Sequence, residues 1–341
     1  MVTLKEQKRV TDPVWLDFLR HLRFGRVREE HLRLLRSLVI SNKGAEEVNF
    51  ADNPWKSAAL VTPRHAVRVQ WNKAALYKQC HDEGKTIYVC NAEDTHKGRF
   101  LTIKEKCLLE THRGKRDRKG GRNRVMKDLP FQIEVAVGMK VMITDNVETD
   151  LDITNGARGE IVGVVLHEDE PDPQGETIVK LKYLPAYILV KLLRTRATKL
   201  QGLDECVVPV EPITTTYRMK IKTTEGKVIQ CTIQRRQFPI TGAYSFTDYH
   251  SQGQTIHYVL IDIGPPPHGT LSLFNLYVAL SRSSGRETIR LLCDFDDKMF
   301  QATHDSELLK EDARLDDLDQ KTLMWYEENV LDRNSQVLEG L

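Results

Sequence analysis

The sequence predicts an α/β fold in which a run of short strands interrupts a parallel sheet with flanking helices. Two stretches carry this prediction. The apolar run 58–61 is followed by a turn, a helix over about 65–79 and a strand over 86–90, an alternation typical of a parallel sheet. Between residues 135 and 236, short β-branched runs recur between turn signals, which is typical of a small barrel.

Length and composition narrow the class of protein. The 341 residues can form one large or two modest domains with a full core, and the composition is that of an ordinary folded protein. The net charge of +2 hides an uneven distribution, because a basic segment at 112–127 offsets an acidic one after residue 301. No apolar run approaches the roughly eighteen residues needed to span a bilayer. We therefore expect a soluble intracellular protein without membrane contact.

Two amphipathic helices are expected near the N-terminus. Asp12 followed by Pro13 is a helix N-cap with proline at the first helical position, and apolar residues then recur at helical spacing up to Gly25. A second helix is expected from about Arg28, with leucines on one side and arginines on the other. We interpret those arginines as a solvated face in preference to a binding site.

Two turns in the predicted sheet need interpretation. Thr62 lies at the carboxyl end of a strand, where α/β sheets bind ligands, so it either contacts a ligand or caps the next helix. Gly84-Lys85-Thr86 matches the end of a phosphate loop. However, that motif requires glycine where Gln79 stands, and it requires a strand where a helix is predicted. We interpret it as a turn, and no other segment of the sequence supplies a phosphate loop.

The sequence predicts no metal site. The stretch 259–262, within an apolar strand expected over 258–263, superficially resembles the strand with a terminal, magnesium-binding aspartate of nucleotide hydrolases, here Asp262. Because no phosphate loop precedes it, we interpret Asp262 as an ordinary strand end. The six cysteines form no C-x-x-C pair and no zinc-site spacing, so reduced thiols are expected.

Residues 96–134 lack clear periodicity and are predicted to form a basic surface excursion. Such a segment could bind a phosphate backbone, nuclear-import machinery or nothing specific. Residues 304–341 are predicted to form an acidic helical tail that packs on the body or on a partner. The cations of the basic excursion between residues 112 and 127 are Arg113, Lys115, Arg116, Arg118, Lys119, Arg122, Arg124 and Lys127.

The most informative stretch is a polar, glycine-interrupted turn at 247–255, rich in side-chain donors, which precedes an apolar strand. About twenty residues later, the segment 277–282 ends on Arg282, whose guanidinium suits an anionic partner. These stretches resemble the fifth and sixth motifs of Pif-family DNA helicases and of Helitron transposon helicases, which belong with RecD in superfamily one.

Two further segments extend this resemblance to about five-sixths of the chain. Residues 137–142 with 155–159 resemble a third signature of these helicases, and residues 2–9, which end on Arg9, resemble their fourth motif. The resemblance implies the second RecA-like motor domain of an ATP-dependent DNA helicase, a parallel sheet with flanking helices, carrying an inserted small Src-homology-type β-barrel. The implied domains are 1–95 with 238–303 for the motor, 96–134 for the basic surface excursion, 135–237 for the barrel and 304–341 for the tail.

The resemblance also implies cofactors and partners. In these helicases ATP and Mg²⁺ are held between two RecA-like domains that walk along single-stranded DNA. We therefore expect single-stranded DNA and a missing N-terminal RecA-like half as partners, and ATP with Mg²⁺ only when that half is present. The nucleus is the expected location, with the mitochondrion as an alternative. DNA repair, DNA recombination and telomere maintenance are the processes that the family suggests.

Individual residues take roles from the matching motifs. Arg9 and Arg282 are expected to be catalytic by stabilising the γ-phosphate, and Gln252 and Gly253 to bind the nucleotide. The residues expected to bind DNA are Thr62, Thr247, Tyr249, His250, Ser251, Arg116 and Lys119.

The sequence departs from the family just before Ser251. The usual histidine and lysine are replaced by Tyr249 and His250, so a mostly neutral ring stands where the family has a fixed positive charge. Tyr249 could instead stack on a base. Two functions therefore remain open. The chain is either a second motor domain that is inactive without the phosphate-loop domain, or a non-catalytic nucleic-acid-binding remnant of a helicase or transposon.

Overall fold

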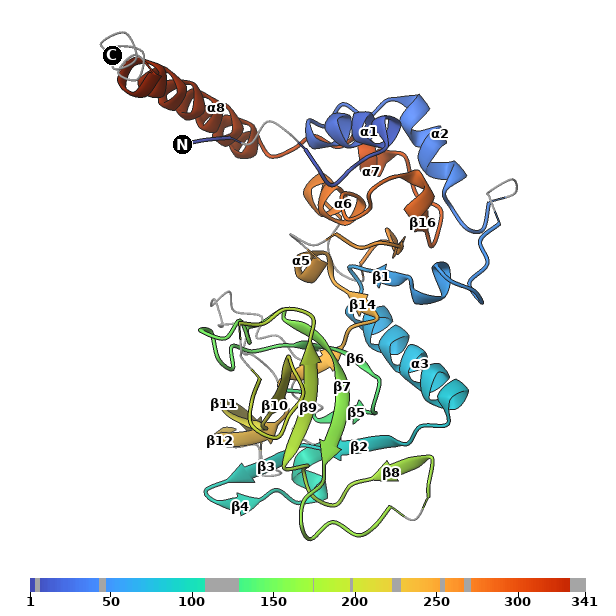
Figure 1. The fold of residues 1–341 in the computed structure, drawn as a ribbon, viewed down its shortest axis with the longest axis vertical. Helices are drawn as coiled ribbons and strands as arrows, with labels where there is room; N and C mark the ends of the chain where they lie inside the picture. Colours follow the sequence, from blue (N-terminus) through green and yellow to red (C-terminus); the bar gives the residue numbers. More distant parts are fainter. Residues whose placement is uncertain are drawn as a thin grey trace. The chain divides into compact units, whose positions relative to one another are not determined.

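The computed structural model describes residues 1–3, 7–42, 47–107, 129–173, 175–196, 199–222, 228–251, 255–266 and 271–331. The chain forms two compact units (Figure 1). The first unit comprises residues 1–68 and 245–341, and the second comprises residues 69–244.

The first unit contains a four-stranded parallel sheet in the order β14-β1-β15-β16. The central strands β1 (Ala59–Val61) and β15 (Val259–Ile261) pair with each other and with the outer strands β14 (Ser245–Phe246) and β16 (Ile289–Leu291). Every residue of β14, β15 and β16 is buried, as expected for parallel strands covered on both faces. The predicted parallel sheet is confirmed.

Both predicted N-terminal helices are present in the first unit. In α1 (Pro13–Arg23) the Asp12 carboxylate accepts hydrogen bonds from the N–H groups of Val14 and Trp15. The helix ends before Gly25, whose positive φ of 64° glycine adopts easily. The second helix is α2 (Glu29–Ser37). The other short helices of this unit are η1 (Trp55–Ser57), α5 (Asp248–Ser251), α6 (Leu273–Leu280), η2 (Arg286–Thr288) and α7 (Lys298–Gln301).

The segment Gly84-Lys85-Thr86 is a turn, as predicted. The long helix α3 (His65–Glu83) precedes it and the strand β2 (Ile87–Asn91) follows it. Gly84 has a φ of 63°, and Lys85 Nζ lies 2.6 Å from the Glu83 carboxylate. The order of helix, turn and strand is the reverse of a phosphate loop.

The prediction that β2 continues the parallel sheet is wrong. Strand β2 pairs antiparallel with β5 (Gln132–Val135) and parallel with β8 (Ile178–Lys180) in a separate three-stranded sheet. Both edges of β1 are already occupied by β14 and β15, so β2 cannot pair with β1. Residues 69–95, which the sequence assigned to the motor domain, belong to the second unit.

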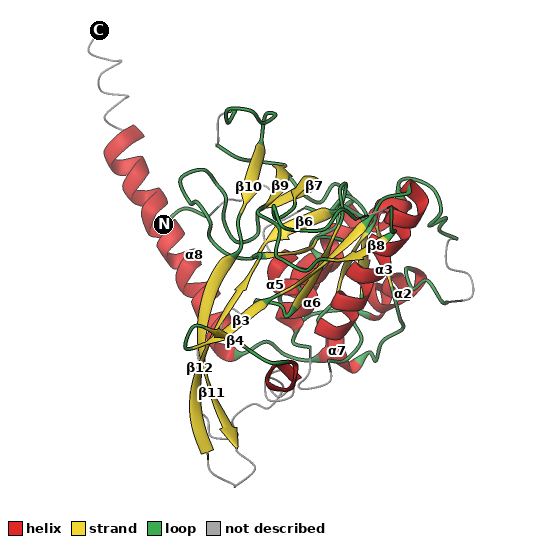
Figure 2. Ribbon diagram, turned by 90° about the horizontal axis from the view of Figure 1, so that it is seen from below, coloured by secondary structure: helices red, strands yellow, loops and turns green. Residues whose placement is uncertain are grey.

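The second unit is built mainly from antiparallel strands, in agreement with the predicted run of short strands. A five-stranded sheet has the order β10-β9-β7-β6-β13, and a four-stranded sheet has the order β11-β12-β3-β4 (Figure 2). A closed barrel remains a prediction. The strands are β3 (Glu93–His96), β4 (Arg99–Phe100), β6 (Lys140–Ile143), β7 (Arg158–Val165), β9 (Tyr187–Leu192), β10 (Val207–Val210), β11 (Ile213–Lys222), β12 (Val228–Gln237) and β13 (Ile240–Gly242).

The pairing of β7 with β9 depends on one glycine. A Cβ atom at Gly159 would lie 2.5 Å from the Lys191 carbonyl oxygen and 2.6 Å from a methyl group of Val190. Any larger residue would push these strands apart, so Gly159 is required for close packing at this point.

The described part of the acidic tail is the helix α8 (Ser306–Tyr326), continued by η3 (Glu327–Leu331). Asp312 on α8 forms an ion pair of 2.9 Å with Arg23, and Asp319 accepts a 2.7 Å hydrogen bond from the Thr3 N–H. The helix therefore contacts both α1 and the N-terminal segment of its own unit. Across the described ranges, no helix combines the length and the apolar character needed to cross a membrane.

Candidate functional site

A cavity of about 530 Å³ in the first unit is rich in cations. Its walls come from residues 7–10, from α1 and from the end of α6 with the two residues that follow. None of the described residues that line it is acidic, so its field attracts anions. The lining residues are Gln7, Lys8, Arg9, Val10, Leu16, Leu19, Arg20, Arg23, Tyr277, Ser281 and Arg282.

Arg9 and Arg282, the two predicted catalytic arginines, both line this cavity although 272 residues separate them. Helices α1 and α6 pack against each other, and both contribute to the lining of the cavity. Arg9 is partly buried. Its Nε donates to the Thr255 hydroxyl at 3.0 Å and its Nη1 donates to the Ser281 carbonyl at 3.4 Å. Arg9 is thus held beside the end of α6 and lines the cavity.

Arg282 is held more tightly. Only 5% of the residue is exposed, and its guanidinium donates to Val278 O at 2.7 Å, Ser251 O at 3.0 Å and Ser281 Oγ at 2.7 Å. Burial lowers the pKa of Arg282 to about 10, and the neighbouring charge of Arg9 acts in the same direction. The group stays protonated at pH 7. In this conformation Arg282 braces the end of α6 against α5.

The α5 turn carries the predicted DNA-contacting residues. Ser251 is buried, its N–H donates to the Thr247 carbonyl at 3.0 Å, and its hydroxyl donates to the Asp248 carbonyl at 2.7 Å. Thr247 is partly buried. Tyr249 and His250 lie within α5, but their side chains are outside the described part of the structure. The predicted residues Gln252, Gly253, Arg116 and Lys119 also lie outside the described residues.

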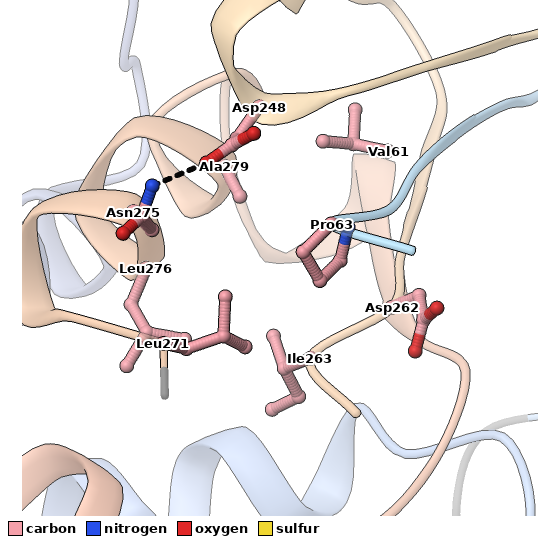
Figure 3. A pocket seen from close by; sticks show the side chains of 9 residues that line it. All are labelled: Val61, Pro63, Asp248, Asp262, Ile263, Leu271, Asn275, Leu276 and Ala279. Atoms are coloured by element: carbon pink, nitrogen blue, oxygen red, sulfur yellow. Dashed lines mark hydrogen bonds between the residues drawn. The ribbon is translucent and has the colours of Figure 1, made fainter. Parts of the chain in front are cut away.

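A side-chain hydrogen bond ties α5 to α6. Asn275 Nδ2 donates to the Asp248 carboxylate beside a small cavity of about 10 Å³ (Figure 3). That volume has room for about one water molecule. Both ends of α5 are therefore held, at Asp248 by Asn275 and at Ser251 by Arg282.

Thr62 and Asp262 belong to one buried network. The Thr62 hydroxyl donates to Asp262 at 2.6 Å, and Arg64 donates through Nε and Nη2 to the same carboxylate, each at 2.8 Å. Both Thr62 and the Asp262 side chain are fully buried. This supports the interpretation of Asp262 as a structural strand end. A contact between Thr62 and DNA would require this network to open.

Sequence reasoning missed three cations of the cavity, namely Lys8, Arg20 and Arg23. Arg20 and Arg23 are three residues apart and share one face of α1. This spacing on a predicted helix, close in sequence to the motif residue Arg9, was the signal that could have identified Arg20 and Arg23 as site residues. Arg23 is also paired with Asp312, which raises its pKa against the opposing effect of burial.

Asp17, His21 and His31 form the one cluster within the described residues whose side chains could converge on a metal ion. The hydrogen bonds argue against that use. The Arg28 N–H donates to His31 Nδ1 at 3.2 Å, so Nε2 carries the proton and donates to Asp17 at 3.1 Å. His21 Nδ1 donates to the Asp17 carbonyl at 2.8 Å. The ring nitrogens that face Asp17 therefore have no lone pair to offer a metal.

Comparison with known proteins places the fold. No family model matches the chain. The ATP-dependent DNA helicase PIF7 of Trypanosoma brucei brucei is 24% identical over 292 residues, which cover 82% of this chain and 27% of that protein. The chain thus spans about a quarter of this curated relative.

Two of the solved structures that share this fold are Pif1 helicases. The Pif1 helicase of Candida albicans matches with a TM-score of 0.58 and 22% identity, covering 92% of this chain and 60% of that one. Bacteroides Pif1 bound to single-stranded DNA matches with a TM-score of 0.56 and 18% identity, covering 91% of this chain and 55% of that one. The architecture is therefore that of a large part of such a protein.

Proposed function

We propose that this chain, a Pif-family relative in sequence and in fold, is the second motor domain of an ATP-dependent DNA helicase. In this role it supplies arginines to the ATP cleft and part of the track for single-stranded DNA. A first RecA-like domain would supply the phosphate loop and the Mg²⁺ ligands, because this sequence has no phosphate loop.

The observation that carries the proposal is the cation-rich cavity. Lys8, Arg9 and Arg282 come from two separate segments that resemble helicase motifs, and Arg20 and Arg23 of α1 add to them. Phosphoryl transfer spreads negative charge over the γ-phosphate oxygens, and fixed guanidinium groups stabilise that charge. The cavity is built to receive such an anion. Arg9 is the better placed of the two predicted catalytic residues, because it is only partly buried whereas Arg282 is 5% exposed.

The α5 turn forms the DNA side of the proposed site. Ser251 accepts from Arg282 through its carbonyl, so the nucleotide-facing arginine and the DNA-facing turn share one hydrogen bond. Thr247, Tyr249 and His250 are the proposed contacts to DNA phosphates or bases, and Ser251 positions them. Bacteroides Pif1, which shares the fold, was solved with single-stranded DNA and supports this choice of partner. Such a helicase would work with DNA in the nucleus or the mitochondrion.

One observation favours the alternative of a non-catalytic nucleic-acid-binding module. Arg282 donates from Nε and from both terminal nitrogens to acceptors within the protein. A catalytic role requires at least one guanidinium N–H of Arg282 to turn toward the γ-phosphate when ATP binds. The motor proposal includes this rearrangement, whereas the alternative leaves Arg282 as a permanent brace.

Two experiments separate these functions. Sequencing the coding region upstream of residue 1 should reveal a G-x-x-x-x-G-K-[ST] motif and an apolar strand that ends in Asp-Glu. Joining this chain to the first motor domain of a Pif1 helicase should produce ATP hydrolysis that single-stranded DNA stimulates. A well-folded fusion without DNA-stimulated hydrolysis, together with an upstream region lacking both motifs, would favour the non-catalytic module.

A further inference from the structure

The last turn of α8 (Figure 1) carries four large apolar residues in a row, which we call the α8 tip: Leu323, Met324, Trp325 and Tyr326. Each is about half exposed, from 46% for Tyr326 to 58% for Trp325. Successive helix residues point about 100° apart, so the four side chains surround the helix and no single face of the first unit could cover them all. Folded proteins avoid such a run of exposed apolar residues unless it has a function.

The contacts that hold α8 to its own unit lie before the tip. Asp312 pairs with Arg23 of α1, and the buried Asp319 accepts the hydrogen bond from the Thr3 N–H. These two acidic residues are seven positions apart, so they share one face of the helix. The helix can therefore stay attached to its unit while the α8 tip binds a partner.

The charges around the α8 tip are acidic. Residues 306–328 carry eight carboxylates and three cations, which gives a net charge of −5. All three cations are paired within the helix at 2.6–2.7 Å: Lys310 with Glu307, Arg314 with Glu311, and Lys321 with Asp317. Asp316, Glu327 and Glu328 flank the tip and are exposed, and no ion pair links them to a described cation. The apolar tip is thus bordered by carboxylates that a cationic partner could pair with.

This combination of apolar and acidic residues selects the partner by its charge. The carboxylates repel nucleic acid and anionic membrane surfaces, and they repel a second copy of the same helix. Tryptophan and tyrosine are enriched among the residues that dominate binding between proteins. We propose that the α8 tip docks on a second protein, against an amphipathic segment whose apolar face is flanked by lysine and arginine.

This inference goes beyond the proposed motor function, because neither ATP nor DNA takes part in the contact. The two kinds of residue have separate tasks. Trp325 and Tyr326 supply apolar area that the partner buries, whereas Asp316 and Glu327 discriminate between partners by charge. Binding should therefore weaken both when Trp325 is removed and when salt screens the carboxylates.

The test measures binding of two fluorescein-labelled amphipathic peptides to the full chain by fluorescence anisotropy. Both are about fourteen residues long, enough to form a helix on binding; one contains leucine and lysine, and the other has glutamate in place of every lysine. The chain should bind the leucine–lysine peptide and not the leucine–glutamate peptide. Trp325→Ala should weaken this binding at least tenfold, as expected for an interface anchor. Asp316→Asn combined with Glu327→Gln should weaken it about fivefold and reduce its salt dependence.

Leu193→Ala and Asp204→Asn are the matched controls, because they remove an exposed apolar residue and an exposed carboxylate from the second unit. Both variants should bind the leucine–lysine peptide like the parent. Met324→Gln changes a second residue of the tip, and glutamine has nearly the helix propensity of methionine. This variant gives an independent test if Trp325→Ala disturbs the helix, which circular dichroism would reveal.

Several results would overturn the proposal. Peptide affinities of Trp325→Ala and Met324→Gln within twofold of the parent, equal binding of the leucine–glutamate peptide, or an equal loss with either control would show that the α8 tip does not select a basic partner. Self-association in light scattering that Trp325→Ala abolishes would make a second copy the occupant. Binding to phosphatidylcholine–phosphatidylserine vesicles that depends on Trp325 would make a lipid surface the occupant. Since no assay contains ATP or DNA, these outcomes are separate from success or failure of the motor proposal.

Discussion

Replacing Arg282 with alanine should destabilise the first unit by about 3 kcal/mol. The guanidinium donates hydrogen bonds of 2.7, 3.0 and 2.7 Å to described residues, in a site where only 5% of the residue is exposed. Hydrogen bonds from a charged donor contribute about 1.5–3 kcal/mol each, but the buried charge itself costs several kcal/mol. Removing the guanidinium leaves its buried acceptors unpaired at about 1–3 kcal/mol each, and relief of the buried charge offsets part of that sum.

Arg9→Ala is the matched comparison for this prediction. Arg9 lies in the same cavity but is partly buried, with longer bonds of 3.0 and 3.4 Å, so its loss should cost less than about 1 kcal/mol. Urea unfolding of the full chain, followed by circular dichroism, measures both values. Arg282→Lys should recover less than half of the loss, because an ammonium cannot reproduce the divergent donors of a guanidinium. If Arg282→Ala unfolded within about 0.5 kcal/mol of the parent, the brace would contribute nothing and the reasoning would fail.

Three other outcomes follow from the same structure. The chain alone should hydrolyse ATP no faster than buffer in a phosphate-release assay, and a DNA-stimulated turnover abolished by Lys85→Ala would overturn the assignment of that segment as a turn. Asp94→Ala should destabilise the second unit by about 3–5 kcal/mol in urea unfolding, because it leaves buried Arg235 without its carboxylate; a loss below about 1 kcal/mol would contradict this. Burial by itself would raise the pKa of Asp12, but hydrogen bonds from Arg286 and from the α1 backbone hold this pKa below its ordinary value. A depressed folded-state pKa gives stability that is present above the unfolded pKa of about 3.9 and lost as pH falls through the folded value, so Asp12→Asn should flatten the acid limb of the stability curve.

Local sequence signals predicted helix boundaries well. Asp12 and Pro13 mark the start of α1, and Gly84 marks the end of α3, because caps and positive-φ glycines act within a few residues of themselves. The sheet to which β2 belongs was not predictable in this way. The choice between joining β1 and joining β5 depends on which edges distant strands already occupy.

The residues of the candidate site were likewise predictable only in part from the sequence. The motif resemblance identified Arg9 and Arg282, which the structure brings to one cavity. It did not identify Arg20 and Arg23, because their membership depends on how α1 turns toward α6. Sequence reasoning also could not predict the hydrogen bond from Arg282 to the Ser251 carbonyl, since hydrogen-bond geometry follows from tertiary packing.

The central claim is that this chain supplies arginines to ATP held mainly by another domain. Single-turnover ATP hydrolysis by a fusion with an intact first motor domain tests it most directly, with fluorescent-nucleotide binding measured on the same proteins. Arg9→Ala and Arg282→Ala should keep nucleotide binding within a few-fold and slow hydrolysis by on the order of 10³-fold or more, as expected for groups that act on the transition state. Arg33→Ala, which removes an exposed arginine from α2 outside the cavity, should hydrolyse ATP like the parent. Hydrolysis by both Arg9→Ala and Arg282→Ala within tenfold of the parent would contradict the account.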